Sequence, residues 1–188
     1  KIMLGTANFS SGYGFKKSKG ISLKDIKKIL NYSKKCGIKN IDTAISYKGV
    51  EKKLGSINLK SFNIYTKLPK LPNKIKKISS WINNQISSSS ARLNKNIYGI
   101  YLHHSNDLIS SKGKLIYENL NFLKKKKIIR KIGVSVYNTN ELDKILDKYK
   151  IDMVQLPLNL FNRTFLYKNY LKKLKKKNIE IHLRSIFL

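Results

Sequence analysis

The chain has 188 residues, of which 41% are hydrophobic, so its size suits one ordinary domain with a substantial core. It has one cysteine, Cys36, and no run of about 18 apolar residues, which excludes an internal disulfide and argues against a transmembrane helix. The formal net charge is +30, but the excess is almost entirely lysine and is spread over every predicted helix, so a dedicated nucleic-acid surface is not indicated.

Short apolar runs alternate with helical patterns along the chain. Each apolar run has the length and character of a strand buried on both faces in a parallel sheet. Strands are expected at residues 1–8, 39–44, 63–68, 97–103, 132–137, 153–158 and 180–188. Apolar residues at helical spacing predict helices at about residues 22–36, 50–57, 75–86, 115–123, 141–149 and 166–177. Ser22 is expected to cap the first helix, with Asp25 as its capping-box partner, and Gly37 to end it.

Strands that alternate with helices predict an α/β fold, either a doubly wound sheet or a closed barrel. The first strand is not followed by a glycine-rich phosphate loop, because Gly12 and Gly14 lie in a long loop rather than a tight strand-to-helix turn. Polar residues lie instead at the carboxyl ends of several strands, where a (β/α)8 barrel builds its active site. We therefore expect residues 1–188 to form a single barrel domain of this type.

Such a barrel closes with eight strands, and the sequence provides seven. An open array of seven strands leaves two unpaired edges. We expect the sequence to be a fragment, that is, a TIM barrel truncated after its seventh strand and an incomplete domain. The alternative is that the missing piece comes from another chain.

An acid, a phenol, an amine and an imidazole occur at successive strand ends, namely Asp42, Tyr47, Lys67 and His103. Reduction of a carbonyl by hydride transfer needs an acid for the oxygen, and a phenol with its free pKa of about 10 is a poor one. A nearby ammonium such as Lys67 favours the phenolate and lowers that pKa. Asp42 could fix and balance Lys67, and His103 could orient the carbonyl oxygen by a hydrogen bond.

Each of these residues has a plainer explanation when taken alone. Asp42 could be a helix cap or an ion-pair partner, Tyr47 could be packing, and Lys67 is one of many lysines. His103 and His104 are adjacent, so they point to opposite faces of a strand, and no cluster of Cys, Asp or Glu completes a ligand set. We therefore expect no metal site, and the ordered appearance of the four residues favours a reductase site.

These residues resemble the catalytic tetrad of the aldo-keto reductases, in the segments IDTAISY, YTKLP and YLHH. Other segments resemble this family in the same order along the chain: LGTANF, VEKKLG, KIGVSVYN, VQLPLNLFNR and EIHLRSIFL. The resemblance implies a (β/α)8 barrel with NADPH or, less often, NADH as cofactor, and Tyr47 as the proton donor. The first and last of these segments resemble bacterial members found with surface-sugar pathways.

The resemblance also implies residues that bind the cofactor. Thr6 matches an early strand-end contact, Ser135 and Gln155 match residues that hold the nicotinamide carboxamide, and Ser185 matches a residue beside the pyrophosphate. Asp42 is expected to lie beside the cofactor as well.

Two positions depart from the family pattern. Val136 stands where the family often has Asn, which removes one expected carboxamide contact. Arg184 stands where many members stack a Tyr on the nicotinamide, and a guanidinium can also stack or pair with phosphate. The family segment for the adenosine 2′-phosphate lies beyond the last strand, so the sequence does not indicate a choice between NADP and NAD.

Three functions are compatible with these observations. The first is NAD(P)H-dependent reduction of an aldehyde or ketone, with a sugar-related carbonyl as one candidate. The second is a catalytically inactive truncated barrel with weakened cofactor binding. The third, a nucleic-acid binder, rests only on charge, and over-use of Lys, Ile and Asn together is typical of an AT-rich genome. We expect a small-molecule carbonyl substrate, no specific nucleic acid, no membrane partner and a cytoplasmic location.

Overall fold

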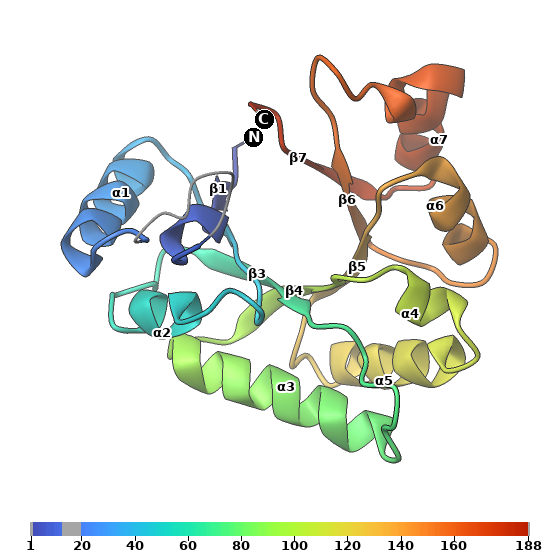
Figure 1. Ribbon diagram of the computed structural model, residues 1–188, viewed down its shortest axis with the longest axis horizontal. Coiled ribbons are helices and arrows are strands. Elements are labelled where there is room, and N and C mark those ends of the chain that lie inside the picture. The colour runs from blue at the N-terminus through green and yellow to red at the C-terminus, as the bar shows by residue number, and fades with distance from the viewer. Residues whose placement is uncertain (1, 13–19, 188) are drawn as a thin grey trace.

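The strands form one curled parallel sheet with helices on its outer side (Figure 1). The computed structural model describes residues 2–12 and 20–187. Its seven strands are ordered along the sheet as they are along the chain: β1 (Leu4–Gly5), β2 (Asn40–Asp42), β3 (Asn63–Leu68), β4 (Ile97–Leu102), β5 (Lys131–Ser135), β6 (Met153–Pro157) and β7 (Glu180–Arg184). Each neighbouring pair is parallel. The described residues thus contain seven of the eight strands of a (β/α)8 barrel, and the expected fold class is confirmed.

Helices connect consecutive strands: α1 (Leu23–Lys35), α2 (Val50–Gly55), α3 (Ile78–Leu93), α4 (Asn106–Ile109), α5 (Gly113–Lys125), α6 (Thr139–Leu146) and α7 (Tyr170–Lys176). Two short 3-10 helices, Ala7–Phe9 and Thr164–Asn169, complete the set. None of the described helices is long and apolar enough to cross a membrane.

Local sequence signals account for several helix boundaries. The hydroxyl of Ser22 accepts a hydrogen bond from the backbone N–H of Asp25 at 3.1 Å, as the predicted cap of α1 requires. Asn138 caps α6 in the same way, accepting from the N–H of Glu141 at 2.9 Å. The predicted start of α3 is three residues early, because Ile75 lies in the preceding loop, where it still packs against the core.

Alternating residues of the strands build two different interiors. Residues that face outward form the main core with the helices, among them Ile41, Ile64, Ile100, Val134 and Val154, all fully buried. Residues that face the barrel axis include a smaller cluster of Tyr65, Tyr101 and Met153. Because side chains alternate along each strand, the polar residues two positions further on face the same axis.

Two glycines make room for the large side chains near the axis. A methyl group on Gly99 would lie 2.5 Å from the ring of Tyr65, its neighbour on β3. A methyl group on Gly133 would lie 2.5 Å from Met153 and 3.0 Å from the ring of Tyr101. Both strands therefore leave space that side chains of neighbouring strands fill.

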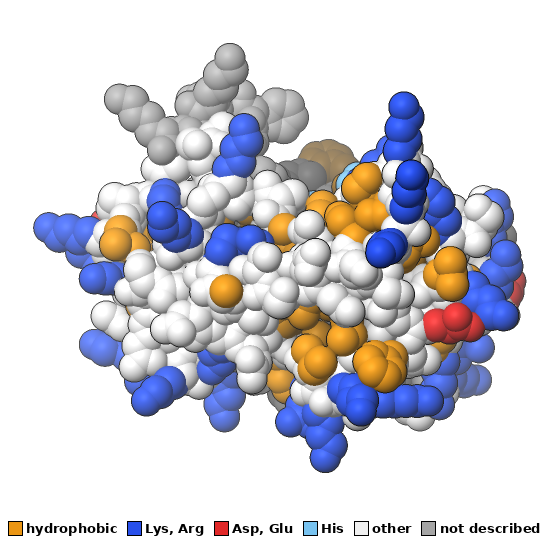
Figure 2. Space-filling view, turned by 90° about the horizontal axis from the view of Figure 1, so that it is seen from below, with side chains coloured by type: hydrophobic (Ala, Val, Ile, Leu, Met, Phe, Trp, Pro, Cys, Tyr) orange, Lys and Arg blue, Asp and Glu red, His pale blue; other side chains and the backbone are white. Residues whose placement is uncertain are grey.

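Lysine side chains are numerous on the molecular surface. On the face shown in Figure 2, Lys and Arg are distributed around the whole outline, with apolar patches and few acidic groups between them.

Candidate active site

A buried ion pair joins the ends of β2 and β3. Lys67 Nζ donates to Asp42 Oδ1 at 2.5 Å and to the carbonyl oxygen of Thr43 at 3.1 Å. The Lys67 residue is only 2% exposed, and burial lowers its pKa, while the charge and hydrogen bond of Asp42 oppose that shift. The pair confirms that these two strand ends meet inside the barrel.

Asp42 is held from two further strands. Thr6, just after β1, donates to the Asp42 carbonyl oxygen from its backbone N–H at 2.9 Å and from its hydroxyl at 3.0 Å. On β6, Gln155 Nε2 donates to Asp42 Oδ2 at 3.2 Å across the barrel. Two residues expected near a cofactor therefore contact Asp42, Thr6 at its backbone carbonyl and Gln155 at its carboxylate.

Tyr47 lies in the loop between β2 and α2, and that loop continues the pairing with β3. Thr43 N–H donates to the Tyr65 carbonyl at 2.8 Å, and Ile45 N–H donates to the Lys67 carbonyl at 3.2 Å. These bonds hold the loop over the end of β3. The half-buried ring of Tyr47 has its centroid 5.6 Å from Lys67 Nζ, so the phenol and the ammonium are neighbours.

His103 follows β4 and completes the group of four. Its ring lies edge-on to that of Tyr47, with centroids 6.4 Å apart. Burial, and then the charges of Lys67 and His104, lower the pKa of His103 to about 4, so its imidazole is neutral at neutral pH. Nδ1 lies 3.4 Å from the hydroxyl of Ser46, and when that hydroxyl donates to Nδ1 the Nε2–H is left as a donor.

Sequence reasoning did not single out Ser46, because a serine in a polar loop carries no signal of its own. It also passed over a second phenol. Tyr101 on β4 is fully buried, and its ring centroid lies 5.9 Å from Lys67 Nζ. The signal was available, since Tyr101 precedes His103 by two positions on one strand and so faces the same side.

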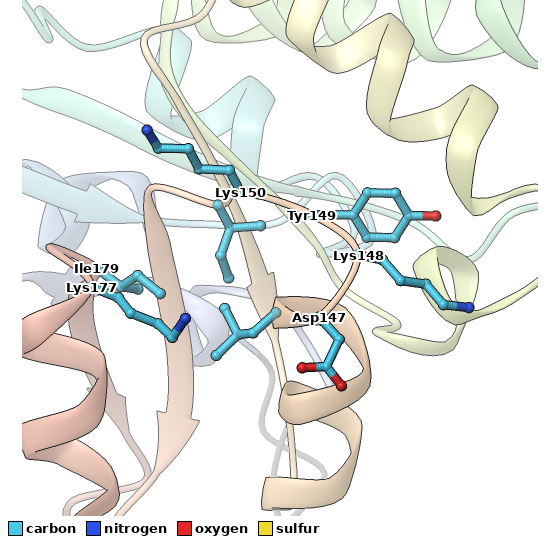
Figure 3. Close-up of a pocket in the computed structure, with 8 residues that line it drawn as sticks. Asp147, Lys148, Tyr149, Lys150, Lys177 and Ile179 are labelled. Atoms are coloured by element: carbon cyan, nitrogen blue, oxygen red, sulfur yellow. The ribbon is translucent and has the colours of Figure 1, made fainter.

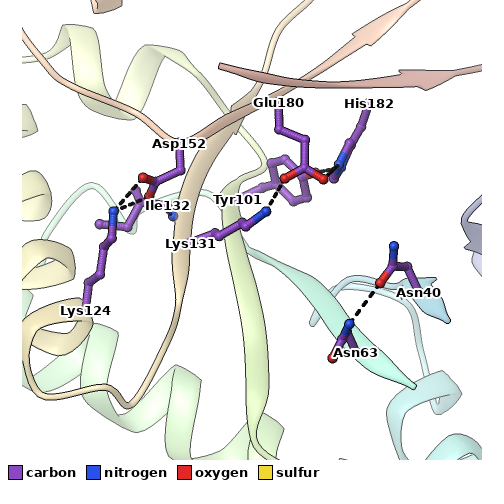
Figure 4. Close-up of polar contacts among 9 residues, drawn as sticks. All are labelled: Asn40, Asn63, Tyr101, Lys124, Lys131, Ile132, Asp152, Glu180 and His182. Carbon is purple, nitrogen blue, oxygen red and sulfur yellow. Dashed lines mark hydrogen bonds and ion pairs between the residues drawn. The ribbon is translucent and has the colours of Figure 1, made fainter. Parts of the chain in front are cut away.

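Tyr101 is anchored deep in the barrel by a chain of polar groups (Figure 4). Its hydroxyl is hydrogen bonded to His182 Nδ1, and His182 Nε2 lies 3.0 Å from Glu180 Oε1. Lys131 forms an ion pair with the other oxygen of Glu180. Burial raises the pKa of Tyr101, and the negative charge of Asp42 adds to the effect, so this phenol keeps its proton.

Ser135 and Gln155 lie side by side on β5 and β6. They are register partners, and each is 3% exposed. Gln155 Oε1 is buried and has no hydrogen-bond partner among the described residues, and the same holds for Thr43 Oγ1. Buried polar atoms are nearly always hydrogen bonded, so the unpaired Gln155 Oε1 inside the barrel marks a place where a polar ligand group fits.

The remaining two expected cofactor residues lie at the end of β7. The guanidinium of Arg184 stacks on the ring of Tyr137, with its Cζ atom 4.2 Å from the ring centroid, and reaches the Val136 carbonyl at 3.5 Å. Ser185 is exposed, and its carbonyl oxygen accepts from Asn159 Nδ2 at 3.0 Å. Arg184 thus lies across the end of β5, beside the strand that carries Ser135.

A hollow of about 390 Å³ lies at the opposite end of the strands (Figure 3). It is formed where α6 leads into β6 and α7 leads into β7, and it is lined by Leu146, Asp147, Lys148, Tyr149, Lys150, Ile151, Lys177 and Ile179. In barrels of this type the amino-terminal end of the strands carries stability rather than chemistry. Within the described part of the chain, no group of three or more His, Cys, Asp or Glu residues could hold a metal ion.

Comparison with known proteins gives one family and one fold. The model of the Aldo/keto reductase family matches residues 1–187. An aldo-keto reductase structure from Pseudomonas aeruginosa superposes with a TM-score of 0.78 at 20% identity, covering 96% of this chain and 71% of that one. No curated protein matches the chain.

Two further solved structures show the same fold. An aldo-keto reductase of Bacillus halodurans in its holo form has a TM-score of 0.77 at 17% identity, with 97% of this chain and 60% of that one covered. One of Klebsiella pneumoniae in complex with NADPH has a TM-score of 0.75 at 19% identity, with 97% and 63% covered. The present chain thus spans between three fifths and three quarters of the length of these structures.

Proposed function

The chain belongs to the aldo/keto reductase family, and from that premise we propose that it reduces an aldehyde or ketone with Tyr47 as proton donor. The observation that carries this proposal is the position of the Lys67 ammonium. It contacts the carboxylate of Asp42 and the ring of Tyr47 in one buried group at the carboxyl ends of the strands.

The residues present fit a nicotinamide cofactor, NADPH or NADH. A carboxamide both donates and accepts, and the buried, unpaired Gln155 Oε1 beside the Ser135 hydroxyl provides an acceptor and a donor. Asp42 accepts from the Gln155 amide across the barrel, Thr6 holds the backbone of Asp42, and Arg184 and Ser185 at the end of β7 are the residues we assign to the phosphate groups. When bound, such a cofactor supplies the hydride for the carbonyl carbon.

The side chains of the group divide the work on the carbonyl oxygen. Tyr47 gives its phenolic proton to that oxygen as charge develops. The Lys67 ammonium stabilises the phenolate left behind, and Asp42 fixes the ammonium. His103 is neutral, so it orients the oxygen by donating an N–H and does not supply the proton itself.

The substrate class follows from the family and is a small-molecule carbonyl compound. We take a sugar-related aldehyde or ketone, a bacterial source and a cytoplasmic location as the finer form of this proposal. It is supported by the segments that open and close the chain and by the single, exposed Cys36, which suits a reducing compartment.

Tyr47→Phe tests the proposal. NADPH oxidation in the presence of a panel of aldehydes should fall by at least about 100-fold, because the positioned acid is lost. Binding of NADPH, followed by fluorescence, should persist. Tyr117→Phe is the matched control, because its phenol donates to the Lys150 carbonyl at 2.7 Å on the outside of the barrel.

Unchanged turnover in Tyr47→Phe would contradict the assigned role. If the unaltered chain neither turns over nor changes NADPH fluorescence while folded, the inactive barrel is the better description.

A further inference from the structure

The Lys67 ammonium lies near two phenol rings, and only one of them belongs to the proposed tetrad. Its Nζ atom is 5.6 Å from the centroid of Tyr47 and 5.9 Å from that of Tyr101. We propose that Tyr101, fixed by His182 and Glu180, is a positioning residue that holds Lys67 in its charged form beside Tyr47. The inference rests on the proposed function for its catalytic meaning, while the effect on Lys67 itself can be measured separately.

Hydrogen bonds satisfy only part of the Lys67 ammonium. A lysine ammonium has three N–H groups, and Lys67 donates two of them, to Asp42 Oδ1 and to the Thr43 carbonyl. The aromatic faces supply the rest of its surroundings. The face of a phenol ring attracts a cation, and the attraction is strongest where water is excluded, as at the fully buried ring of Tyr101.

Polar contacts at its hydroxyl fix the Tyr101 ring. The Tyr101 hydroxyl is hydrogen bonded to His182 Nδ1, His182 Nε2 meets Glu180 Oε1, and Lys131 pairs with the same carboxylate (Figure 4). Gly133 lies beside the ring, where any side chain would press on Tyr101. The hydrogen bond at the hydroxyl therefore restrains the orientation of the ring under Lys67, and Gly133 leaves the space that this orientation needs.

A comparison with Tyr65 distinguishes a positioning role of Tyr101 from simple packing. Tyr65 is a second buried phenol on the same inner surface, and its ring centroid lies 5.4 Å from the ring of His182. It precedes Lys67 by two residues on β3, yet within the described residues no contact joins its ring to the Lys67 ammonium. Tyr65 therefore shares the packing of Tyr101 without the contact that matters.

The groups around Lys67 determine in which direction loss of the Tyr101 ring should shift the pKa of Lys67. Charged or titratable groups around Lys67 come from four segments: Asp42 on β2, Tyr47 in the following loop, Tyr101 and His103 along and after β4, and Arg184 on β7. Burial and Arg184 lower the pKa of Lys67, whereas Asp42 raises it. A ring face also favours the charged amine, so its removal should lower the pKa of Lys67 further.

The experiment compares Tyr101→Met with Tyr65→Met in protein labelled with ¹⁵N-lysine. The Lys67 side-chain signal is identified by its loss in Lys67→Arg and followed by NMR as the pH is raised. Tyr101→Met should move the Lys67 transition down by about one pH unit. Tyr65→Met should leave it within about 0.3 unit of the wild type, since a cation–π contact is not removed there.

Equal transitions in the two methionine variants would overturn the proposal. If Tyr101→Met does not fold, the unaltered protein decides the matter, because the two rings should shift the Cε protons of Lys67 upfield. Cε protons at ordinary lysine positions would then overturn it. If the Lys67 transition moves while the alkaline limb of carbonyl reduction does not, the positioning role stands and the proposed function fails.

Discussion

Two buried charge clusters lie on opposite faces of β3, and they differ in how completely their polar atoms are hydrogen bonded. Thr66 points outward and Lys67 points inward, so neighbouring residues of one strand serve the two clusters. Outside the barrel, Glu51 is 2% exposed, and its carboxylate accepts from Thr66 at 3.0 Å, Ser89 at 2.7 Å and Arg92 at 2.9 and 2.6 Å. Every oxygen of that carboxylate has a partner.

The inner cluster leaves a polar atom unpaired. Lys67 and Asp42 bind each other, but Gln155 Oε1 has no partner in the part of the chain that the structure describes. An unpaired buried acceptor costs about 1–3 kcal/mol. The outer cluster therefore fastens α2 and α3 to the sheet, whereas the inner one retains bonding capacity that a ligand can use.

The largest expected effect is on the outer cluster. Arg92→Met leaves the buried Glu51 carboxylate with two hydroxyl partners and no counter-charge, so the free energy of unfolding should fall by about 3 kcal/mol. Urea unfolding measures the change, and turnover per folded molecule should be unaffected.

Lys67→Met is the paired variant for the inner cluster. Its partner Asp42 keeps the Gln155 amide, and its side chain is 18% exposed, so the loss of stability should be smaller than in Arg92→Met. Carbonyl reduction should nevertheless disappear. Similar stability losses in the two variants would remove the distinction between the clusters.

A pH effect of intermediate size is expected at His103. Its folded-state pKa of about 4 lies below the ordinary 6.5, so the unfolded chain takes up a proton at higher pH than the folded one. Stability should therefore fall as the pH drops from about 6.5 to 4, by about 1–2 kcal/mol once solvent screening of this part-exposed ring is allowed for.

Unfolding curves of the wild type and His103→Gln over this range isolate the contribution. The difference in unfolding free energy between them should change with pH between 6.5 and 4 and level off below 4. A constant difference across that window would show that the imidazole is not held neutral.

The smallest change in stability is expected at Gln155. Gln155→Met removes a hydrogen bond to Asp42 but also a buried oxygen without a partner, so the unfolding free energy should stay within about 1 kcal/mol of the wild type. NADPH affinity should fall by about 10-fold, since an amide contact to the cofactor is lost. Ser89→Ala is the matched variant, because its hydroxyl serves the saturated outer cluster. A large stability loss in Gln155→Met alone would show that Gln155 is structural.

The sequence predicted the bounds of an element best where the segment has few alternative structures. Strand β3 has the predicted bounds, 63–68, because an apolar run buried on both faces has few other structures open to it. The start of α3 was placed early at Ile75, because an apolar residue at helical spacing also packs well from a loop. The short helix α4 carried no periodic signal at four residues.

For the site, chain order indicated which strand ends come together, and the structure places Asp42, Tyr47, Lys67 and His103 in one group. The residues beneath this group could not be predicted in the same way. The link between Tyr101 and His182 spans 81 positions and depends on barrel curvature, which no local pattern encodes.

The glycines at 99 and 133 determine how the space near the barrel axis is filled. Because these positions have no side chain, the side chains of Tyr65, Tyr101 and Met153 from neighbouring strands occupy that space. The packing near the barrel axis is thus set jointly by several strands. A single added methyl at Gly133 would press on the Tyr101 ring and so change the surface that Lys67 contacts. Such a substitution would act on the proposed site without replacing any residue of the proposed tetrad.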